Sequence, residues 1–289
     1  MHDKKGDKEN ILVLQYDEIT AKINMLNQQL YSLSRTGREL MWGGGAPGSY
    51  KTADEMSSKG WKSSEIPMFP IVGNANGNKV LIGGKYYDMG RHGIARHVGF
   101  VDDFTSESCV EFAQTYKANT SVKSGSERYE FPFSYTLRKS FQVTSNGLEA
   151  AICVQNKSEN EAMPFAVGWH PAFVVDYSDP HAPEDSISIP GHGSWGLTAL
   201  LKLIKKEGAL ICKNAYEASI KSRGNETRLN MVSTLPHMMI WSQQRLPFIC
   251  IETISALPDG EYSGELGKKP GYQVLEPGAW QNNRISIKV

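Results

Sequence analysis

An excess of charge of either sign is absent from this chain: 289 residues include 31 lysines and arginines and 31 aspartates and glutamates. No run of five or six like charges interrupts that balance. Nucleic acids and anionic membranes attract proteins through fields of basic residues, so the composition argues against both as partners. A small neutral ligand is the favoured partner, and the sequence leaves the oligomeric state open.

Cysteine is scarce, and its four positions lie outside any Cys-x-x-Cys pair. Zinc and thioredoxin-like sites therefore have no support, and Cys153 and Cys250, which lie in apolar runs, are best interpreted as buried thiols. An even number of cysteines would also suit the disulfides of a secreted protein. The first ten residues are polar and charged, however, without the apolar segment of a signal peptide, so we expect a reduced, cytoplasmic protein.

Long apolar runs and cofactor motifs are lacking as well. No stretch approaches the roughly 18 apolar residues of a membrane-spanning helix. A Gly-x-Gly-x-x-Gly loop between strand and helix, a Walker loop, a Gly-x-Ser-x-Gly elbow and a His-Glu-x-x-His helix are all missing. The histidines show no metal-ligand spacing. The sequence thus predicts neither an organic cofactor nor a bound metal.

Strand and turn patterns dominate what is present. Asn146-Gly147 between two runs typical of strands is a strong hairpin signal, since both turn residues must accept positive φ. Gly83-Gly84 marks a second tight hairpin in the same way. The expected strands are residues 80–82, 85–87, 135–144, 148–156, 238–241, 248–253 and 285–289.

Two segments fall outside this pattern. Residues 197–206 form either about two helical turns, with lysines at the favourable C-terminal end, or a strand or irregular connection. Residues 43–64 are rich in glycine, serine and lysine and are expected to form a long loop. Many strands without alternating helices predict an all-β fold, a large antiparallel β-sandwich with few short helices. We expect a polar extension over residues 1–10 and a single domain over 11–289.

Two of the seven histidines stand in sequences that suit sugar chemistry. His92 lies in Gly-Arg-His-Gly-Ile-Ala-Arg and His170 in Gly-Trp-His-Pro-Ala-Phe, where the nearby glycines allow close backbone approach. Trp169 and Phe173 flank His170 with flat apolar surfaces that suit the C–H faces of a pyranose, and an imidazole exchanges protons near neutral pH. The competing interpretation of any lone histidine is a structural imidazole.

A single carboxylate is the other candidate. Glu252 ends the apolar run over residues 247–251. A carboxyl at the end of a buried strand should have a raised pKa unless it is paired, which would make it a base near neutrality. A paired structural glutamate or an exposed strand end is the alternative interpretation.

Taken together, these segments resemble the aldose 1-epimerase (galactose mutarotase) superfamily, in particular its bacterial branch similar to the lactose-operon mutarotase-like protein. The matching pieces, in chain order, are residues 69–73, 92–96, 132–133, 168–173, 250–252 and 275–278. The likeness covers nearly the whole chain from Ile11 onward. His-Gly-x-Ala-Arg and Gly-x-His-Pro-x-Phe are fairly specific as a pair, whereas each alone would be weak.

The resemblance implies a β-supersandwich with an open sugar cleft and an isomerase that interconverts α and β anomers without metal or cofactor. It implies that Glu252 is the general base for the C1 hydroxyl and that His170 is the general acid for the ring oxygen O5. His92 and Arg96 are implied to bind the sugar. Because acid and base serve opposite sides of C1–O5, we expect a sugar-sized gap between them in one cleft.

Three positions depart from the family pattern. Asn74 stands where many members have an arginine that grips sugar hydroxyls, so we expect Asn74 to line a changed sugar-binding site. His97 follows the His-Gly-x-Ala-Arg piece in place of the common acid. Thr253 begins a Thr-Ile-Ser sequence where relatives often have Pro-Trp and a glycine.

Other functions compete with this interpretation. A non-catalytic carbohydrate-binding protein on the same fold is favoured by the change at Asn74, but binding alone needs no acid–base pair such as Glu252 and His170. A glycoside hydrolase needs two opposed carboxylates, and the sequence offers one candidate. In a further alternative, the epimerisation of a hexose 6-phosphate, Arg91 or Arg96 holds the phosphate.

Overall fold

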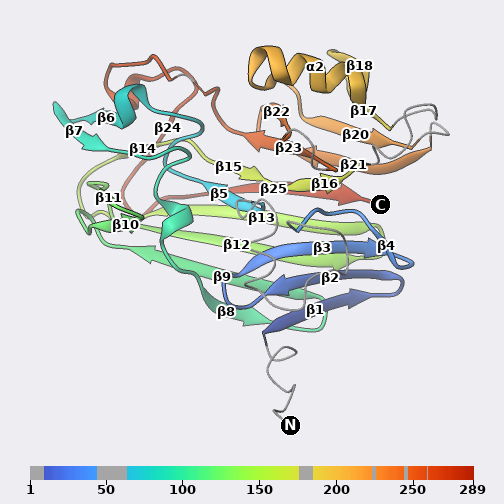
Figure 1. The fold of residues 1–289 in the computed structure, drawn as a ribbon. Coiled ribbons are helices and arrows are strands. Elements are labelled where there is room, and N and C mark those ends of the chain that lie inside the picture. The colour runs from blue at the N-terminus through green and yellow to red at the C-terminus, as the bar shows by residue number, and fades with distance from the viewer. Residues whose placement is uncertain (1–9, 44–63, 176–184, 223–225, 244–246, 259) are drawn as a thin grey trace, which may run out of the picture.

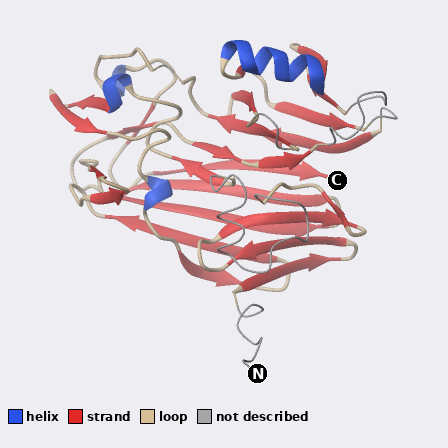
Figure 2. Cartoon of the chain, in the orientation of Figure 1, coloured by secondary structure: helices blue, strands red, loops and turns tan. Residues whose placement is uncertain are grey.

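The chain folds into layered antiparallel sheets, seen in Figures 1 and 2 for a computed structural model. The structure describes residues 10–43, 64–175, 185–222, 226–243, 247–258 and 260–289. Within these residues strands prevail, and there is one α-helix, α2 (Leu197–Glu207). The prediction of an all-β sandwich with few short helices is therefore confirmed.

The largest sheet has nine strands, and all of its pairings are antiparallel. In spatial order it contains β18 (Gly193–Gly196), β17 (Ser186–Ile189), β20 (Glu217–Lys221), β21 (Thr227–Ser233), β25 (Trp280–Lys288), β13 (Gly147–Asn156), β12 (Tyr135–Thr144), β9 (Cys109–Tyr116) and β8 (Val101–Thr105).

Smaller sheets cover this one (Figure 1). A six-stranded sheet holds β19 (Leu210–Lys213), β22 (His237–Trp241), β23 (Phe248–Ile254), β15 (Gly168–His170) and β5 (Ile66–Met68), and β16 (Ala172–Val174) also pairs with β23. A four-stranded sheet holds β1 (Ile11–Tyr16), β2 (Ile19–Asn24), β3 (Gln29–Arg35) and β4 (Arg38–Glu39). Two-stranded pairs are β6 (Lys79–Ile82) with β7 (Lys85–Asp88), β10 (Val122–Ser124) with β11 (Glu127–Tyr129), and β14 (Met163–Phe165) with β24 (Gln273–Leu275). Single 3₁₀ turns are η1 (Asn76–Asn78), η2 (Ala95–His97) and η3 (Leu266–Lys268).

The main hydrophobic core lies between the nine-stranded sheet and these smaller sheets. It is one contiguous cluster that joins Leu137 of β12, Leu14 of β1 and Ile251 of β23. Side chains alternate across a strand, so one face of the six-stranded sheet packs on this core while the other face points away from it. That second face carries the candidate site.

Both predicted hairpins and the helix are present in the structure. The hairpin pairings β12–β13 and β6–β7 are confirmed, with Thr144 opposite Gly147 and Ile82 opposite Lys85. Of the two alternatives for residues 197–206 the structure has the helix, because Leu200 and Ile204 fall on one buried face at helical spacing. The last strand begins at Trp280 rather than at residue 285.

Other sequence predictions stand differently. The loop expected over residues 43–64 lies almost entirely outside the described residues, and the division into an extension over 1–10 and one domain over 11–289 stays a prediction. All four cysteines are free. Cys250 is buried as predicted, whereas Cys153 is only half-buried because it lies on the outward side of β13. No helix in the described residues is long and apolar enough to cross a membrane.

Candidate active site

Strand register brings His170 and Glu252 together. Trp169 pairs with Thr253 across β15 and β23, and Ala172 pairs with Cys250 across β16 and β23. The same register sets His170 opposite Glu252, at the point where Pro171, which has no N–H, separates the two short strands. Directly opposed residues on one face of an antiparallel pair lie close enough to interact.

The two side chains are in direct contact. The Nε2 atom of His170 lies 3.2 Å from Oε1 of Glu252, and both side chains are buried. The expected sugar-sized gap between them is therefore wrong. A buried carboxyl and a buried imidazole would each carry a desolvation cost if left apart, and pairing offsets part of that cost. The prediction that they converge on one cleft is borne out by the geometry, since both line the same cavity.

Burial controls the protonation of this pair. It raises the pKa of the Glu252 carboxyl well above its usual range, and the Arg91 guanidinium opposes this only in part. Burial, and after it the charges of His92, Arg96 and Arg91, lowers the pKa of the His170 imidazole well below its usual range. Both shifts disfavour the doubly charged form, and the raised pKa of Glu252 also disfavours the fully deprotonated form. Over an intermediate pH range the pair therefore holds one proton, on Glu252, and His170 is neutral. Moving that proton between the two groups leaves the net charge unchanged.

His92 is held as a neutral hydrogen-bond donor. The backbone N–H of Gly73 donates to its Nδ1 at 3.2 Å, so in the neutral ring the proton belongs to Nε2. Burial, followed by the charges of Arg91 and Arg96, lowers the pKa of His92 to about 3. The His92 ring meets the His170 ring edge-on, with centroids 5.3 Å apart. At neutral pH His92 can therefore offer Nε2–H to an oxygen in the cleft.

Two arginines supply positive charge to the same cavity. Arg91 and Arg96 both line it, with Arg91 exposed and Arg96 partly buried. Burial and the neighbouring Arg91 charge lower the pKa of the Arg96 guanidinium, which nevertheless remains a cation at neutral pH because arginine titrates above 12 in water. The arrangement can hold oxygen-rich or anionic ligands.

The cleft has a volume of about 360 Å³. Asn74 lines it at an exposed position, as the sequence predicted. Trp241 of β22, which pairs with Cys250 of β23, forms part of the wall. Its ring meets the His170 ring edge-on, with centroids 6.1 Å apart. The end of α2 and the start of β19 contribute residues 207–211 in part. An aromatic wall with a few converging polar groups is typical of small-molecule sites.

Trp169 lies on the other face of the sheet and is not a cleft residue, contrary to the sequence prediction. Its side chain is buried in the main core, because it precedes His170 by one residue and strand neighbours face opposite sides. Its Nε1–H donates to Glu65 at 2.7 Å. The Glu65 carboxylate also pairs with buried Lys139 at 2.9 Å, and the Glu65 N–H donates to the His170 carbonyl at 2.8 Å. Glu65 therefore braces β15 from behind the cleft.

Sequence reasoning found the residues that carry motifs and missed those that do not. Glu252, His170, His92, Arg96 and Asn74 all line the cleft. Trp241 and Met239 were missed because an alternating strand does not reveal which of its faces meets a ligand. The pairing of Met239 with Glu252 in the sheet is the signal that would have located them. Among the described residues, no group of three or more histidines, cysteines or carboxylates could hold a metal ion.

Comparison with known proteins gives consistent matches. The family model described as aldose 1-epimerase matches residues 38–279. The chromosomal and plasmid LacX proteins of Lactococcus lactis subsp. lactis are each 23% identical over 292 residues, which covers 88% of this chain and 90% of each relative.

Two solved structures are similar over almost their full length. A galactose mutarotase-like protein from Lactobacillus casei ATCC 334 has a TM-score of 0.75 at 23% identity, covering 96% of this chain and 99% of that one. A galactose mutarotase related enzyme from Lactobacillus acidophilus has a TM-score of 0.75 at 22% identity, covering 96% of each chain. These likenesses agree with the galactose mutarotase-like sandwich predicted from the sequence.

Proposed function

We propose that this chain, which belongs to the aldose 1-epimerase family, interconverts the α and β anomers of an aldose by acid–base opening and closure of the sugar ring. The observation that carries this proposal is the contact between Glu252 and His170 on the floor of the cleft. A buried carboxyl and imidazole that share one proton can accept a proton and donate one in the same step.

In the reaction, the Glu252 carboxylate takes the proton of the C1 hydroxyl while His170 gives its proton to O5. The C1–O5 bond breaks, and O1 becomes the carbonyl oxygen of a free aldehyde. Rotation about C1–C2 presents the other face of the carbonyl. The reverse proton transfers then close the ring as the other anomer, so the reaction consumes nothing.

The short distance within the pair suits this chemistry. O1 and O5 are bonded to the same carbon, so the groups that serve them must be close neighbours. For the reaction, the contact between Glu252 and His170 has to be replaced by contacts with the sugar, Glu252 with the C1 hydroxyl and His170 with O5. Each positioned group is expected to contribute roughly 10² to 10⁴ in rate. The one proton of the pair lies on Glu252, and its transfer to His170 gives the carboxylate and the imidazolium that the reaction requires.

The remaining cleft residues would bind and orient the sugar. Nε2–H of His92 and the guanidinium of Arg96 are donors for hydroxyl oxygens, and Asn74 offers an amide at the rim. The ring of Trp241 provides the flat apolar surface that was expected of Trp169. We assign no cofactor or metal to the reaction, and a cytoplasmic location stays a prediction.

A phosphorylated hexose is the second candidate substrate. The observation in its favour is the presence of two arginines, Arg91 and Arg96, on one cavity. Guanidinium groups bind phosphate through paired hydrogen bonds, and no carboxylate besides Glu252 and Glu207 is among the described cleft residues. The cationic side of the cleft would then hold the 6-phosphate while Glu252 and His170 act on C1.

Anomer exchange measured by NMR over a panel of aldoses and their 6-phosphates tests the proposal and selects the substrate. The expected result is acceleration of exchange for one sugar or a small set of them. Tight binding of a sugar without any acceleration would instead identify a non-catalytic carbohydrate-binding protein, and the proposal would be wrong.

A further inference from the structure

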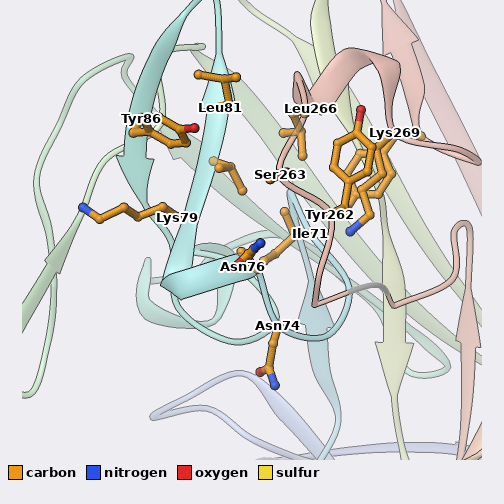
Figure 3. Close-up of a pocket in the computed structure, with 14 residues that line it drawn as sticks. Ile71, Asn74, Asn76, Lys79, Leu81, Tyr86, Tyr262, Ser263, Leu266 and Lys269 are labelled. Atoms are coloured by element: carbon orange, nitrogen blue, oxygen red, sulfur yellow. The ribbon is translucent and has the colours of Figure 1, made fainter.

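A second cavity, of about 190 Å³, lies between the β6–β7 hairpin and the chain segment that contains η3 (Figure 3). Tyr86 of β7 lines one side, and Tyr262 and Ser263 line the other. Asn76 and Lys269 add an amide and an ammonium group. The volume corresponds to roughly six water molecules at about 30 Å³ each, which is the size of one sugar ring rather than of a crevice for single waters.

Hydrogen bonds fix the walls of this cavity. The Glu265 carboxylate accepts the N–H groups of Gly83 and Gly84 at 2.9 and 2.8 Å, which attaches the hairpin tip to the opposite segment. The Asn76 amide donates to the Glu261 carbonyl at 2.9 Å, and the Tyr262 hydroxyl donates to the Glu265 carbonyl at 3.0 Å. A pocket held in this way loses little freedom when a ligand enters.

The lining suits a neutral sugar. Aromatic faces accommodate the C–H surface of a pyranose, and amide, hydroxyl and ammonium groups bond its hydroxyls. The Lys269 Nζ lies 5.6 Å from the Tyr262 ring centre and 5.1 Å from that of Tyr272. This packing keeps the ammonium group in a fixed place against the tyrosines.

This cavity adjoins the proposed catalytic cleft. Asn74 lines both, and in Figure 3 its side chain points away from the tyrosines. The two chain segments on either side continue from one cavity into the other: Gly73 and Pro258 line the cleft, whereas Asn76 and Tyr262 line the second cavity. Two binding sites therefore share one wall.

A series of contacts from Glu252 to Asn74 predicts how a sugar is oriented in the cleft. Glu252 touches His170, the His170 ring meets the His92 ring, and Gly73, the neighbour of Asn74, bonds His92. The reacting C1–O5 end thus belongs at one end of this series, and the opposite, non-reducing side of the sugar points toward Asn74. A ring-opening reaction needs a free anomeric carbon in the cleft, so any second sugar must be attached to that non-reducing side.

We propose that the second cavity binds the non-reducing unit of a reducing disaccharide, linked 1→3 or 1→4, whose reducing unit occupies the cleft. The proposal rests on the proposed function for the identity of the cleft ligand. It makes the substrate class an oligosaccharide end rather than a free monosaccharide alone.

Calorimetric titration of the Glu252→Gln variant measures binding without turnover. The probes are the aldose that binds best in a panel of glucose, galactose and mannose, and disaccharides that carry this aldose at the reducing end, such as cellobiose, maltose and lactose for glucose. We expect the best disaccharide to bind about three- to tenfold more tightly than its monosaccharide, the effect of one added aromatic contact. In a Glu252→Gln/Tyr86→Ala variant that ratio should fall to about one.

Tyr87→Ala in the same background is the matched control. Tyr87 follows Tyr86 in β7 and faces the other side of the hairpin, where it lines a separate open groove with Pro132 and Phe133. The disaccharide preference should survive this change. Ser263→Phe, which places a ring inside the second cavity, should remove the preference as Tyr86→Ala does.

Equal affinities for monosaccharide and disaccharide, or a preference that Tyr86→Ala and Ser263→Phe both leave intact, would overturn the inference. Catalysed anomer exchange of monosaccharides by the wild-type protein would still support the proposed function in that case. A disaccharide preference without any catalysed exchange would have the opposite meaning, since the second binding site would stand and the enzymatic function would fall.

Discussion

At the scale of single residues, the Glu252 carboxyl stands out because burial strongly disfavours its ionised form. Its pKa is raised because it is buried, and the Arg91 guanidinium compensates only in part. A buried carboxyl in this state disfavours its own ionisation, which costs stability once the pH is high enough to remove the proton. Such a cost is typical of sites where function, rather than packing, selects the residue.

Stability should therefore depend on pH through Glu252. Its pKa is higher in the folded than in the unfolded chain, so the native state holds the extra proton and stability falls as the pH rises between the two values. Glu252→Gln removes this contribution. We expect the difference in melting temperature, variant minus wild type, to increase as the pH is raised from about 5 to about 9. Glu207→Gln, at an exposed carboxyl on the cleft rim, is the control and should show no such trend.

Asn74 provides a prediction about binding. An arginine at this rim position would add a charge-assisted hydrogen bond to sugar hydroxyls, worth about 1.5–3 kcal/mol. Asn74→Arg should then lower KM for glucose or galactose by about tenfold or more, with little change in kcat, because ground state and transition state gain equally. Weaker binding of the best substrate would indicate a pocket shaped for another sugar.

At the scale of elements, two strands decide which side chains reach the cleft. In β15 and β23 the residues alternate between the main core and the candidate site, so Trp169 and Ile251 face the core while His170 and Glu252 face the cleft. The sequence reveals the alternation but not its phase relative to the ligand. For that reason Trp169 was predicted as a sugar-binding residue and Trp241 was not.

The correction at Trp169 can be tested separately. Trp169→Phe keeps a large ring in the core but loses the N–H that bonds Glu65. The unfolding free energy should fall by about 1–3 kcal/mol because a buried carboxylate oxygen loses its partner. Denaturant unfolding measures this loss, and KM for the sugar should stay close to that of the wild type. A large rise in KM would show that the indole contacts the ligand after all.

The turn at residues 146–147 also combines a feature that the local sequence predicts with one that depends on a distant strand. The hairpin at Asn146-Gly147 was predicted from its two residues, yet Gly147 is the first residue of β13 with φ of +147°. A Cβ there would lie 1.9 Å from the Ile287 carbonyl oxygen of β25. Close approach of a distant strand, rather than the turn, is what requires glycine at this position.

At the scale of the whole molecule, the sandwich was predictable and the assembly of the cleft was not. Strand-forming runs, their turns and the segments around His170 and Glu252 carry local patterns. The cleft combines a loop at Asn74, the motif around His92 and Arg96, the end of α2, and four strands of one sheet. The long-range pairing of strands decides which of these segments lie side by side. No local sequence pattern predicts that Trp241 contacts His170. The contact between Glu252 and His170 follows equally from pairing, not from either motif alone.

The central claim is that Glu252 and His170 transfer the protons that open the sugar ring. Saturation-transfer NMR of anomer exchange, with the best sugar of the panel, tests it on the wild type, Glu252→Gln and His170→Asn. We predict that both variants keep the fold and bind the sugar while catalysed exchange falls by roughly 10² or more in each. Full exchange activity in either variant, with the sugar bound, would contradict the assignment.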